Sequence, residues 1–354
     1  MTRTILAAMS LALLLPWSAQ AAERPTRTGD FIARNVAFKS GETLPEVRMH
    51  YTTLGTPHRN AKGEIDNAVM VLHGTGGSGR NFLVPMFADE LYGPGQPLDL
   101  ATTYVILPDN IGHGGSSKPS DGLRMAFPRY DYDDMVALQH RLLVEGLGVK
   151  RLKLILGTSM GCMHAFVWGE TYPGFAERLA PFACNAVALA GRNRMWRKMA
   201  IDAIRADPAW MGGNYTTQPL AGLRTVTDLL ILAGANPVAQ QAQYPTREAT
   251  EKALDQAFNA RIGAIDANDA LYYIDASRNY DPSPALEKIT VPVLWVNSAD
   301  DFINPPELGL AEQLVKRMPK ARFVLIPAST ETRGHGTHTA AKFWKADLAK
   351  LLAQ

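Results

Sequence analysis

The chain has 354 residues, of which 46% are hydrophobic and 20% are charged, and its formal net charge is +2. This is the composition of an ordinary globular protein with enough apolar material for a large core. The near-neutral charge and the lack of any basic run indicate neither a nucleic-acid partner nor a membrane-surface protein.

The first residues have the pattern of a secretory signal peptide. Arg3 supplies a positive start, an apolar run covers residues 5–17, and residues 19–21 form an Ala-Gln-Ala cleavage motif. The run is short for a membrane span of about 20 residues. We therefore predict a signal peptide over residues 1–21, no stable membrane insertion after cleavage, and a periplasmic or secreted mature protein.

The rest of the chain alternates between apolar runs and helical patterns. Residues 31–38 and 45–55 alternate apolar and polar side chains, as edge strands do. Short apolar runs predict buried strands, and apolar residues at helical spacing predict a helix between them over 132–149 and a last helix over 337–354. The predicted buried strands are 67–74, 103–110, 152–157, 181–190, 291–298 and 321–329. We expect an α/β fold with a mostly parallel sheet covered by helices on both faces.

One region interrupts this alternation. Residues 191–286 contain no clear strand, only helical patterns. We predict that they form a helical cap over the carboxyl ends of the strands, inserted into a core made of residues 22–190 and 287–354. The cap carries apolar and basic side chains that either line a substrate site or pack the cap on itself: Trp196, Met199, Trp210, Met211, Tyr215, Arg192, Arg194 and Arg197.

The motif Gly-Thr-Ser-Met-Gly places Ser159 between a predicted strand and a predicted helix. This is the context of a nucleophilic serine on a sharp strand-to-helix turn, where glycines allow close approach of the backbone. The alternative is a serine that only caps the helix. We predict that Ser159 is the nucleophile.

A serine nucleophile needs a histidine base and a carboxylate, and this architecture supplies them in the order Ser, Asp, His. Two aspartates, Asp300 and Asp301, follow a late strand, and we favour Asp301 because it lies four residues before Pro305. The last loop offers His335 and His338, and we favour His335 because it lies between two glycines. No third ligand cluster accompanies the histidine pair, so we expect no metal and no cofactor.

The oxyanion of acyl chemistry needs hydrogen-bond donors. We predict the backbone N–H groups of Met160 and of Thr75 in the loop His-Gly-Thr-Gly-Gly-Ser-Gly. The glycine-rich segment 108–117 lacks the context of a phosphate loop, and we interpret it as a structural loop held by Asp109 and His113.

Four segments carry a family resemblance: 127–149, 156–173, 197–215 and 300–307. On these segments the chain resembles the α/β-hydrolase superfamily, and within it the homoserine O-acetyltransferase family and its hydrolase relatives. The resemblance implies Ser159, Asp301 and His335 as nucleophile, acid and base. The loop at residues 73–79 differs from the H-A-x-T-G type of the family's transferases, and residues 108–117 resemble the corresponding turn of ordinary hydrolases.

We expect a secreted serine hydrolase that cleaves an ester, lactone or amide small molecule, with a carboxylic ester as the first choice. The alternative is an acyltransferase that moves an acyl group from a thioester to an alcohol such as homoserine. A predicted export signal favours water as the acceptor, because acetyl-CoA and homoserine are cytosolic. A third alternative, a catalytically silent binding protein, is disfavoured by the complete order Ser, Asp, His. The sequence leaves open the oligomeric state, a homodimer included, and whether Cys162 and Cys184 form a disulfide.

Overall fold

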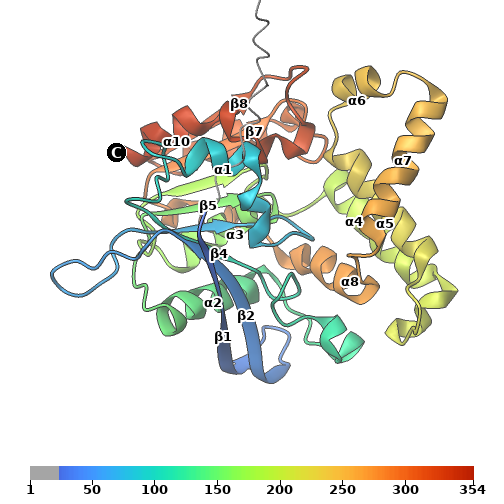
Figure 1. Ribbon diagram of the computed structural model, residues 1–354, viewed down its shortest axis with the longest axis horizontal. Coiled ribbons are helices and arrows are strands. Elements are labelled where there is room, and N and C mark those ends of the chain that lie inside the picture. Colours follow the sequence, from blue (N-terminus) through green and yellow to red (C-terminus); the bar gives the residue numbers. More distant parts are fainter. Residues whose placement is uncertain (1–23) are drawn as a thin grey trace, which may run out of the picture.

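An eight-stranded sheet forms the centre of the protein (Figure 1). The computed structural model describes residues 24–354, so the predicted signal peptide lies outside the described residues. The strand order is β1-β2-β4-β3-β5-β6-β7-β8, with β1 antiparallel to β2, β2 antiparallel to β4, and the other pairs parallel. The strands are β1 Thr26–Ala37, β2 Thr43–Leu54, β3 Ala68–Leu72, β4 Tyr104–Pro108, β5 Leu154–Thr158, β6 Leu179–Phe182, β7 Val293–Ser298 and β8 Ala321–Ile326. The predicted mostly parallel sheet is confirmed.

The central strands are continuous apolar runs because both of their faces are covered. Along β3, Met70 and Leu72 belong to one hydrophobic cluster and Val69 and Val71 to another. The first cluster includes side chains of α2 (Tyr132–Arg141) and α3 (Met160–Thr171), and the second includes side chains of α1 (Pro85–Leu91) and α10 (Lys345–Leu352). The sheet therefore has helices packed on both of its faces.

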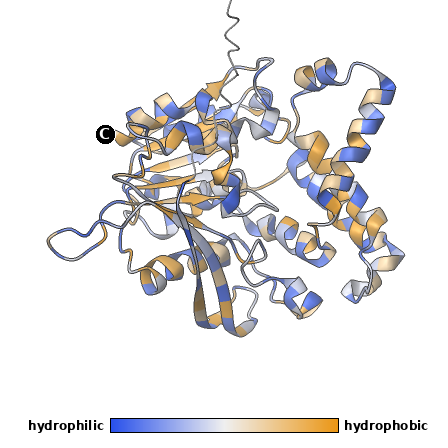
Figure 2. Ribbon diagram, in the orientation of Figure 1, coloured by the Kyte–Doolittle hydropathy of each residue, from blue (hydrophilic) through white to orange (hydrophobic). Residues whose placement is uncertain are grey.

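Helices that follow β6 lie to one side of this core (Figures 1 and 2). They are α4 Gly191–Ala206, α5 Leu220–Gly234, α6 Pro237–Gln243, α7 Arg247–Ile262 and α8 Ala267–Asp275, and the chain returns to the core before β7 and the short α9 (Leu310–Leu314). A separate apolar cluster, with members such as Ile204, Val226 and Ile274, holds α4, α5 and α8 together. These helices occupy the predicted cap, whose boundaries at 191 and 286 stay a prediction.

Several element boundaries differ from the prediction, and two of the largest differences lie in β6 and α10. The strand predicted over 181–190 ends at Phe182, because Ala183 has a φ of 65° and turns the chain out of the sheet. The helix predicted from residue 337 begins at Lys345, and 3-10 turns precede it. In both places the irregular chain next to the regular element also buries apolar residues, such as Cys184 and Trp344.

Cys162 of α3 and Cys184, two residues after β6, form a disulfide. The bond therefore joins the helix that follows Ser159 to the segment that leaves the next strand.

Among residues 24–354, no helix has the length and apolar character needed to cross a membrane.

Candidate active site

Ser159 occupies a strained turn between β5 and α3. Its φ of 56° and ψ of −111° are unusual for a residue with a side chain. A Cβ at Gly157 would lie 1.9 Å from the carbonyl oxygen of Gly161, and one at Gly161 would lie 2.1 Å from the carbonyl oxygen of Leu72. Only glycine fits at either position, so the two glycines of the motif allow the serine to stand at the end of the strand.

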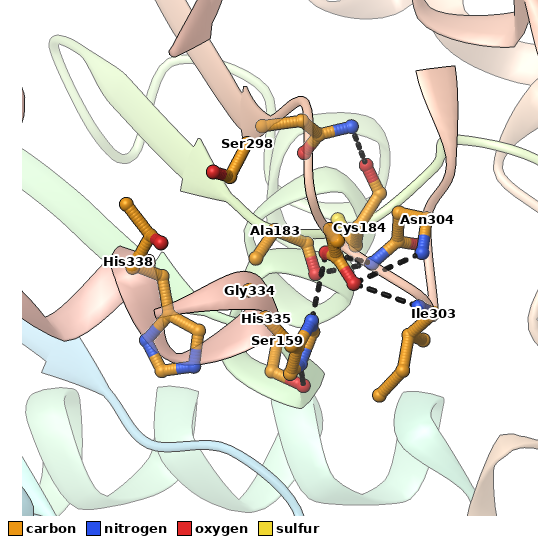
Figure 3. A network of polar contacts seen from close by, with 12 residues as sticks. Ser159, Ala183, Cys184, Ser298, Ile303, Asn304, Gly334, His335 and His338 are labelled. Carbon is orange, nitrogen blue, oxygen red and sulfur yellow. Dashed lines mark hydrogen bonds and ion pairs between the residues drawn. The ribbon is translucent and has the colours of Figure 1, made fainter. Parts of the chain in front are cut away.

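A chain of hydrogen bonds joins Ser159, His335 and Asp301, and Figure 3 shows His335 beside Ser159. The distance from His335 Nε2 to Ser159 Oγ is 2.8 Å, and that from His335 Nδ1 to Asp301 Oδ2 is also 2.8 Å. Because a carboxylate only accepts, Nδ1–H donates to Asp301, which leaves Nε2 free to accept from the serine hydroxyl. The structure thus brings together the three residues predicted as nucleophile, base and acid.

Asp301 lies almost entirely out of solvent, with 2% of its surface exposed. Its Oδ1 accepts hydrogen bonds from the backbone N–H groups of Ile303 and Asn304, and its Oδ2 accepts from Asn304 Nδ2 at 3.0 Å. Burial alone raises the pKa of a carboxyl group, but the charge and hydrogen bond of His335 and the Asn304 donors outweigh it and hold the pKa of Asp301 below its ordinary value. The group therefore remains a carboxylate beside the histidine.

Asn304 was not predicted as part of the site. Its Nδ2 also donates to the carbonyl oxygen of Ala183 at 3.0 Å, so one side chain links the loop after β7 to the loop after β6. The position of Asn304 three residues after Asp301 was visible in the sequence, but an asparagine in a loop is too common to be singled out.

Asp300 and His338, the alternatives to Asp301 and His335 in the sequence, have other hydrogen-bond partners. Asp300 does not contact His335; its Oδ2 accepts hydrogen bonds from Thr332 Oγ1 and from the backbone N–H of Gly334. The ring of His338 lies 5.2 Å from that of His335, and its Nδ1 lies 2.9 Å from Thr339 Oγ1. Burial lowers the pKa of His338 to about 3, which keeps it neutral.

Gly74 lies directly against Ser159, since a Cβ there would be 3.2 Å from Ser159 Cβ. The carbonyl oxygen of Gly74 accepts hydrogen bonds from His73 Nδ1 at 2.8 Å and from the N–H of Gly77 at 3.0 Å. In a trans peptide the N–H points opposite to the C=O, so the N–H of Thr75 points away from His73. Met160 opens α3, where an N–H group has no partner within the helix. Met160 therefore follows Ser159 directly in the chain, and Thr75 follows Gly74, the residue that lies against Ser159.

A network of buried polar side chains holds the loop at Gly74 in place. His73 Nε2 accepts from the backbone N–H of Asn110 at 3.0 Å, and Gln139 Nε2 contacts both Asn110 Oδ1 and His164 Nδ1. Trp168 Nε1 donates to Gln139 Oε1 at 2.7 Å. His164 and Trp168 belong to α3, so the network connects the loop at Gly74 to the helix that begins at Met160.

His164, one of the two histidines in this network, makes the free energy of unfolding depend on pH. Burial lowers the pKa of His164 to about 3, whereas an unfolded histidine titrates near 6.5. Below pH 6.5 the unfolded chain binds more protons, so the free energy of unfolding falls as the pH falls, by up to about 1.4 kcal/mol per pH unit for one histidine. We expect His164→Gln to make the dependence of the free energy of unfolding on pH shallower between pH 6 and 4.5 in urea titrations. Parallel curves for the two proteins would contradict this.

The glycine-rich segment after β4 is held by Asp109. Its Oδ1 accepts from the N–H of Gly79 at 2.7 Å and its Oδ2 from the N–H of Gly115 at 2.8 Å. The ring of His113 packs between the rings of His73 and Tyr273, with centroids 5.0 and 5.2 Å away. These contacts are those of a structural loop beside the site, as expected.

A cavity of about 1000 Å³ lies between the cap and the loop that carries Asp301. Apolar residues make up much of its wall, among them Leu232 and Pro237 from the cap and Phe302 and Ile303 from the loop. The guanidinium of Arg192 lies 3.9 Å from the centre of the Phe302 ring. Asp300 and Asp301 belong to the wall of this cavity, whereas Ser159 and His335 do not, so the cavity lies beside the loop that carries Asp301.

Most of the cap residues singled out in the sequence do not line this cavity. Trp210 Nε1 donates to Asn268 Oδ1, and Tyr215 OH donates to Asp266 Oδ2, so both pack the cap on itself. Met199 and Met211 are exposed, Trp196 and Arg197 are buried, and only Arg192 is a wall residue. Among residues 24–354, no group of three or more His, Cys, Asp or Glu is placed to hold a metal ion.

Comparisons with known proteins agree with this architecture. The family model of the α/β-hydrolase fold matches residues 67–330. A homoserine O-acetyltransferase of Chloroherpeton thalassium is 29% identical, with 84% of this chain and 81% of the relative covered. A probable acyltransferase of Methanothermobacter thermautotrophicus is 30% identical, with 81% of this chain and 86% of the relative covered.

Solved structures show the same fold. A homoserine O-acetyltransferase from Bacillus anthracis superposes with a TM-score of 0.81 at 23% identity, covering 94% of this chain and 99% of the other. The acetyl esterase MekB superposes with a TM-score of 0.78 at 24% identity, covering 93% and 97%. The chain belongs to the α/β-hydrolase family, and within it it resembles the homoserine O-acetyltransferases.

Proposed function

We propose that the protein is a serine hydrolase that cleaves a small carboxylic ester through an acyl-enzyme on Ser159. The observation that carries this proposal is the continuous hydrogen-bond chain from Ser159 through His335 to Asp301. In this mechanism Ser159 Oγ attacks the ester carbonyl and His335 Nε2 takes its proton. His335 then gives the proton to the departing alcohol, and Asp301 stabilises the imidazolium in between.

The backbone N–H groups of Thr75 and Met160 are the donors that would stabilise the oxyanion of the tetrahedral intermediate. In the second half of the reaction, His335 activates water by taking one of its protons. The hydroxide adds to the acyl carbonyl, and Ser159 leaves with the proton returned by His335. No cofactor takes part in these steps.

A second candidate function, acyl transfer, differs from hydrolysis only in the molecule that accepts the acyl group. If an alcohol replaces water, the same acyl-enzyme performs acyl transfer, as the names of the relatives suggest. The homoserine O-acetyltransferase and the probable acyltransferase support this candidate more directly than they support hydrolysis. The different loop at residues 73–79 and the signal-type N-terminus support water. The Cys162–Cys184 disulfide also fits the proposed export, because disulfides persist in oxidising compartments.

Product analysis distinguishes the two acceptors. We expect p-nitrophenyl acetate to yield free acetate at the same rate with or without millimolar homoserine. We also expect acetyl-CoA with homoserine to release no coenzyme A above the rate with acetyl-CoA alone. O-acetylhomoserine as the main product, or coenzyme A release that requires homoserine, would replace hydrolysis by transfer.

We propose that the acyl chain of the substrate extends from Ser159 into the cavity beside the loop that carries Asp301, and that the protein therefore prefers esters with acyl chains longer than acetate. Each methylene buried against its apolar wall contributes up to about 0.8 kcal/mol. We expect p-nitrophenyl hexanoate to have a kcat/KM roughly tenfold above that of the acetate. Leu232→Trp, which fills part of the cavity, should remove the difference.

Leu220 provides a matched control for Leu232. It lies on the same helix α5 and is exposed, but it is not a wall residue of the cavity. Leu220→Trp should therefore keep the preference for hexanoate. An acetate preference in the wild type, or the same effect from both variants, would show that the cavity does not receive the acyl group.

A further inference from the structure

Asn236 joins the cap to the loop that carries His335. We propose that Asn236 is a positioning residue, whose side chain holds this loop against Asp300 and so keeps His335 aligned with Ser159. The inference rests on the acyl-enzyme function proposed above. It gives the cap a part in catalysis besides that of enclosing the substrate.

The Asn236 side chain is buried, with 4% of the residue exposed, and both ends of its amide are used. Its Oδ1 accepts from the backbone N–H groups of Val238 and Ala239, and so caps the start of α6. Its Nδ2 lies 2.7 Å from the carbonyl oxygen of Thr332 and 2.9 Å from that of Ser329. One end of the amide therefore belongs to the cap and the other end holds the histidine loop.

Asp300 holds the same loop from the core side. Its Oδ2 accepts from Thr332 Oγ1 at 2.8 Å and from the N–H of Gly334 at 3.0 Å. Gly334 comes directly before His335 in the chain. The loop is thus held by Asn236 of the cap at Ser329 and Thr332, and by Asp300 of the core at Thr332 and Gly334.

The backbone of the cap also presses on the loop at Gly334. This residue has a φ of +57°, and a Cβ there would lie 2.5 Å from the carbonyl oxygen of Ala235, the residue before Asn236. Glycine is required both by its conformation and by this contact. The tight fit leaves the loop little freedom as long as the amide of Asn236 is in place.

A general base must remain within hydrogen-bond reach of the proton that it takes. Without Asn236 Nδ2, the carbonyl oxygens of Ser329 and Thr332 each lose a hydrogen-bond donor, and the segment before His335 gains freedom. The fraction of molecules with His335 aligned then falls. This lowers kcat, whereas substrate binding in the cavity is affected less.

The test distinguishes two roles of the Asn236 side chain, which are holding the loop before His335 and capping α6. Asn236→Ser keeps a hydroxyl that can cap α6 but is too short to reach the loop carbonyls. Thr246→Ala is the matched control, because Thr246 caps α7 through its hydroxyl and is exposed. We expect Asn236→Ser to lower kcat for p-nitrophenyl acetate at least tenfold with less than a threefold change in KM, and Thr246→Ala to leave kcat unchanged.

Thr332→Val provides a second test that leaves the Asn236 side chain in place and removes one of its contacts, the hydrogen bond to Thr332 Oγ1. It removes the hydroxyl that bonds to Asp300, and we expect it to lower kcat in the same way and to act less than multiplicatively with Asn236→Ser, since both release one loop. Wild-type kcat in a folded Asn236→Ser protein, or in Thr332→Val if the first does not fold, would overturn the inference. Failure of the proposed function has a different signature, namely ester turnover that survives Ser159→Ala.

Discussion

Replacing Ser159 by alanine is expected to lower kcat for p-nitrophenyl ester hydrolysis by about ten-thousand-fold or more, because the acyl-enzyme cannot form. The turnover that remains would come from the oxyanion donors and from substrate binding alone. The alanine variant should fold, since Ser159 Oγ has only His335 as a side-chain partner. Initial rates with purified wild-type and variant protein test this prediction.

A melting temperature within a few degrees of wild type would show that the variant has kept its fold. Alanine has a Cβ as serine does, so the substitution leaves the backbone constraint at φ 56° unchanged. Ester turnover near the wild-type rate in such a folded variant would exclude Ser159 as the nucleophile.

The second large effect is expected at Asp301. Asp301→Asn cannot accept the Nδ1–H of His335 in the same way, so the imidazole loses the tautomer that leaves Nε2 free for Ser159. We expect kcat to fall by about ten-thousand-fold at pH 7. The measurement is kcat of the purified variant over a range of pH.

The adjacent carboxylate gives a matched control. Asp300→Asn keeps an oxygen that can accept from the loop, so we expect a loss of roughly tenfold or less. Equal losses in the two variants would mean that both residues act only through the fold of the loop. A larger loss in Asp300→Asn would reverse the assignment of the acid.

Local rules explain why much of the architecture is predictable from the sequence. Continuous apolar runs such as residues 67–74 indicate strands covered on both faces, and the structure has β3 there. The glycines around Ser159 indicate the sharp turn, because a side chain at Gly157 or Gly161 would clash with neighbouring backbone. The chain order Ser, Asp, His then narrows the partners to two aspartates and two histidines.

The remaining features depend on contacts between distant segments. Asp300 and Asp301 are neighbours with the same side chain, and only the packing of the last loop decides which of them faces His335. Asn236 and Asn304 lie in loops far from Ser159 in the sequence, where asparagine is common. The Cys162–Cys184 pairing likewise depends on how the segment after β6 turns at Ala183. No periodicity or motif records such contacts.

The most direct test of the account is to trap the acyl-enzyme. The wild-type protein would be mixed with excess p-nitrophenyl acetate, quenched in acid within the first turnover, digested and analysed by mass spectrometry. We predict that the peptide containing Ser159 gains the mass of one acetyl group, that fragmentation places the acetyl group on Ser159, and that Ser159→Ala shows no such peptide. Hydrolysis with no acetylated peptide, or with the acetyl group on another residue, would contradict the central claim that Ser159 carries the acyl group.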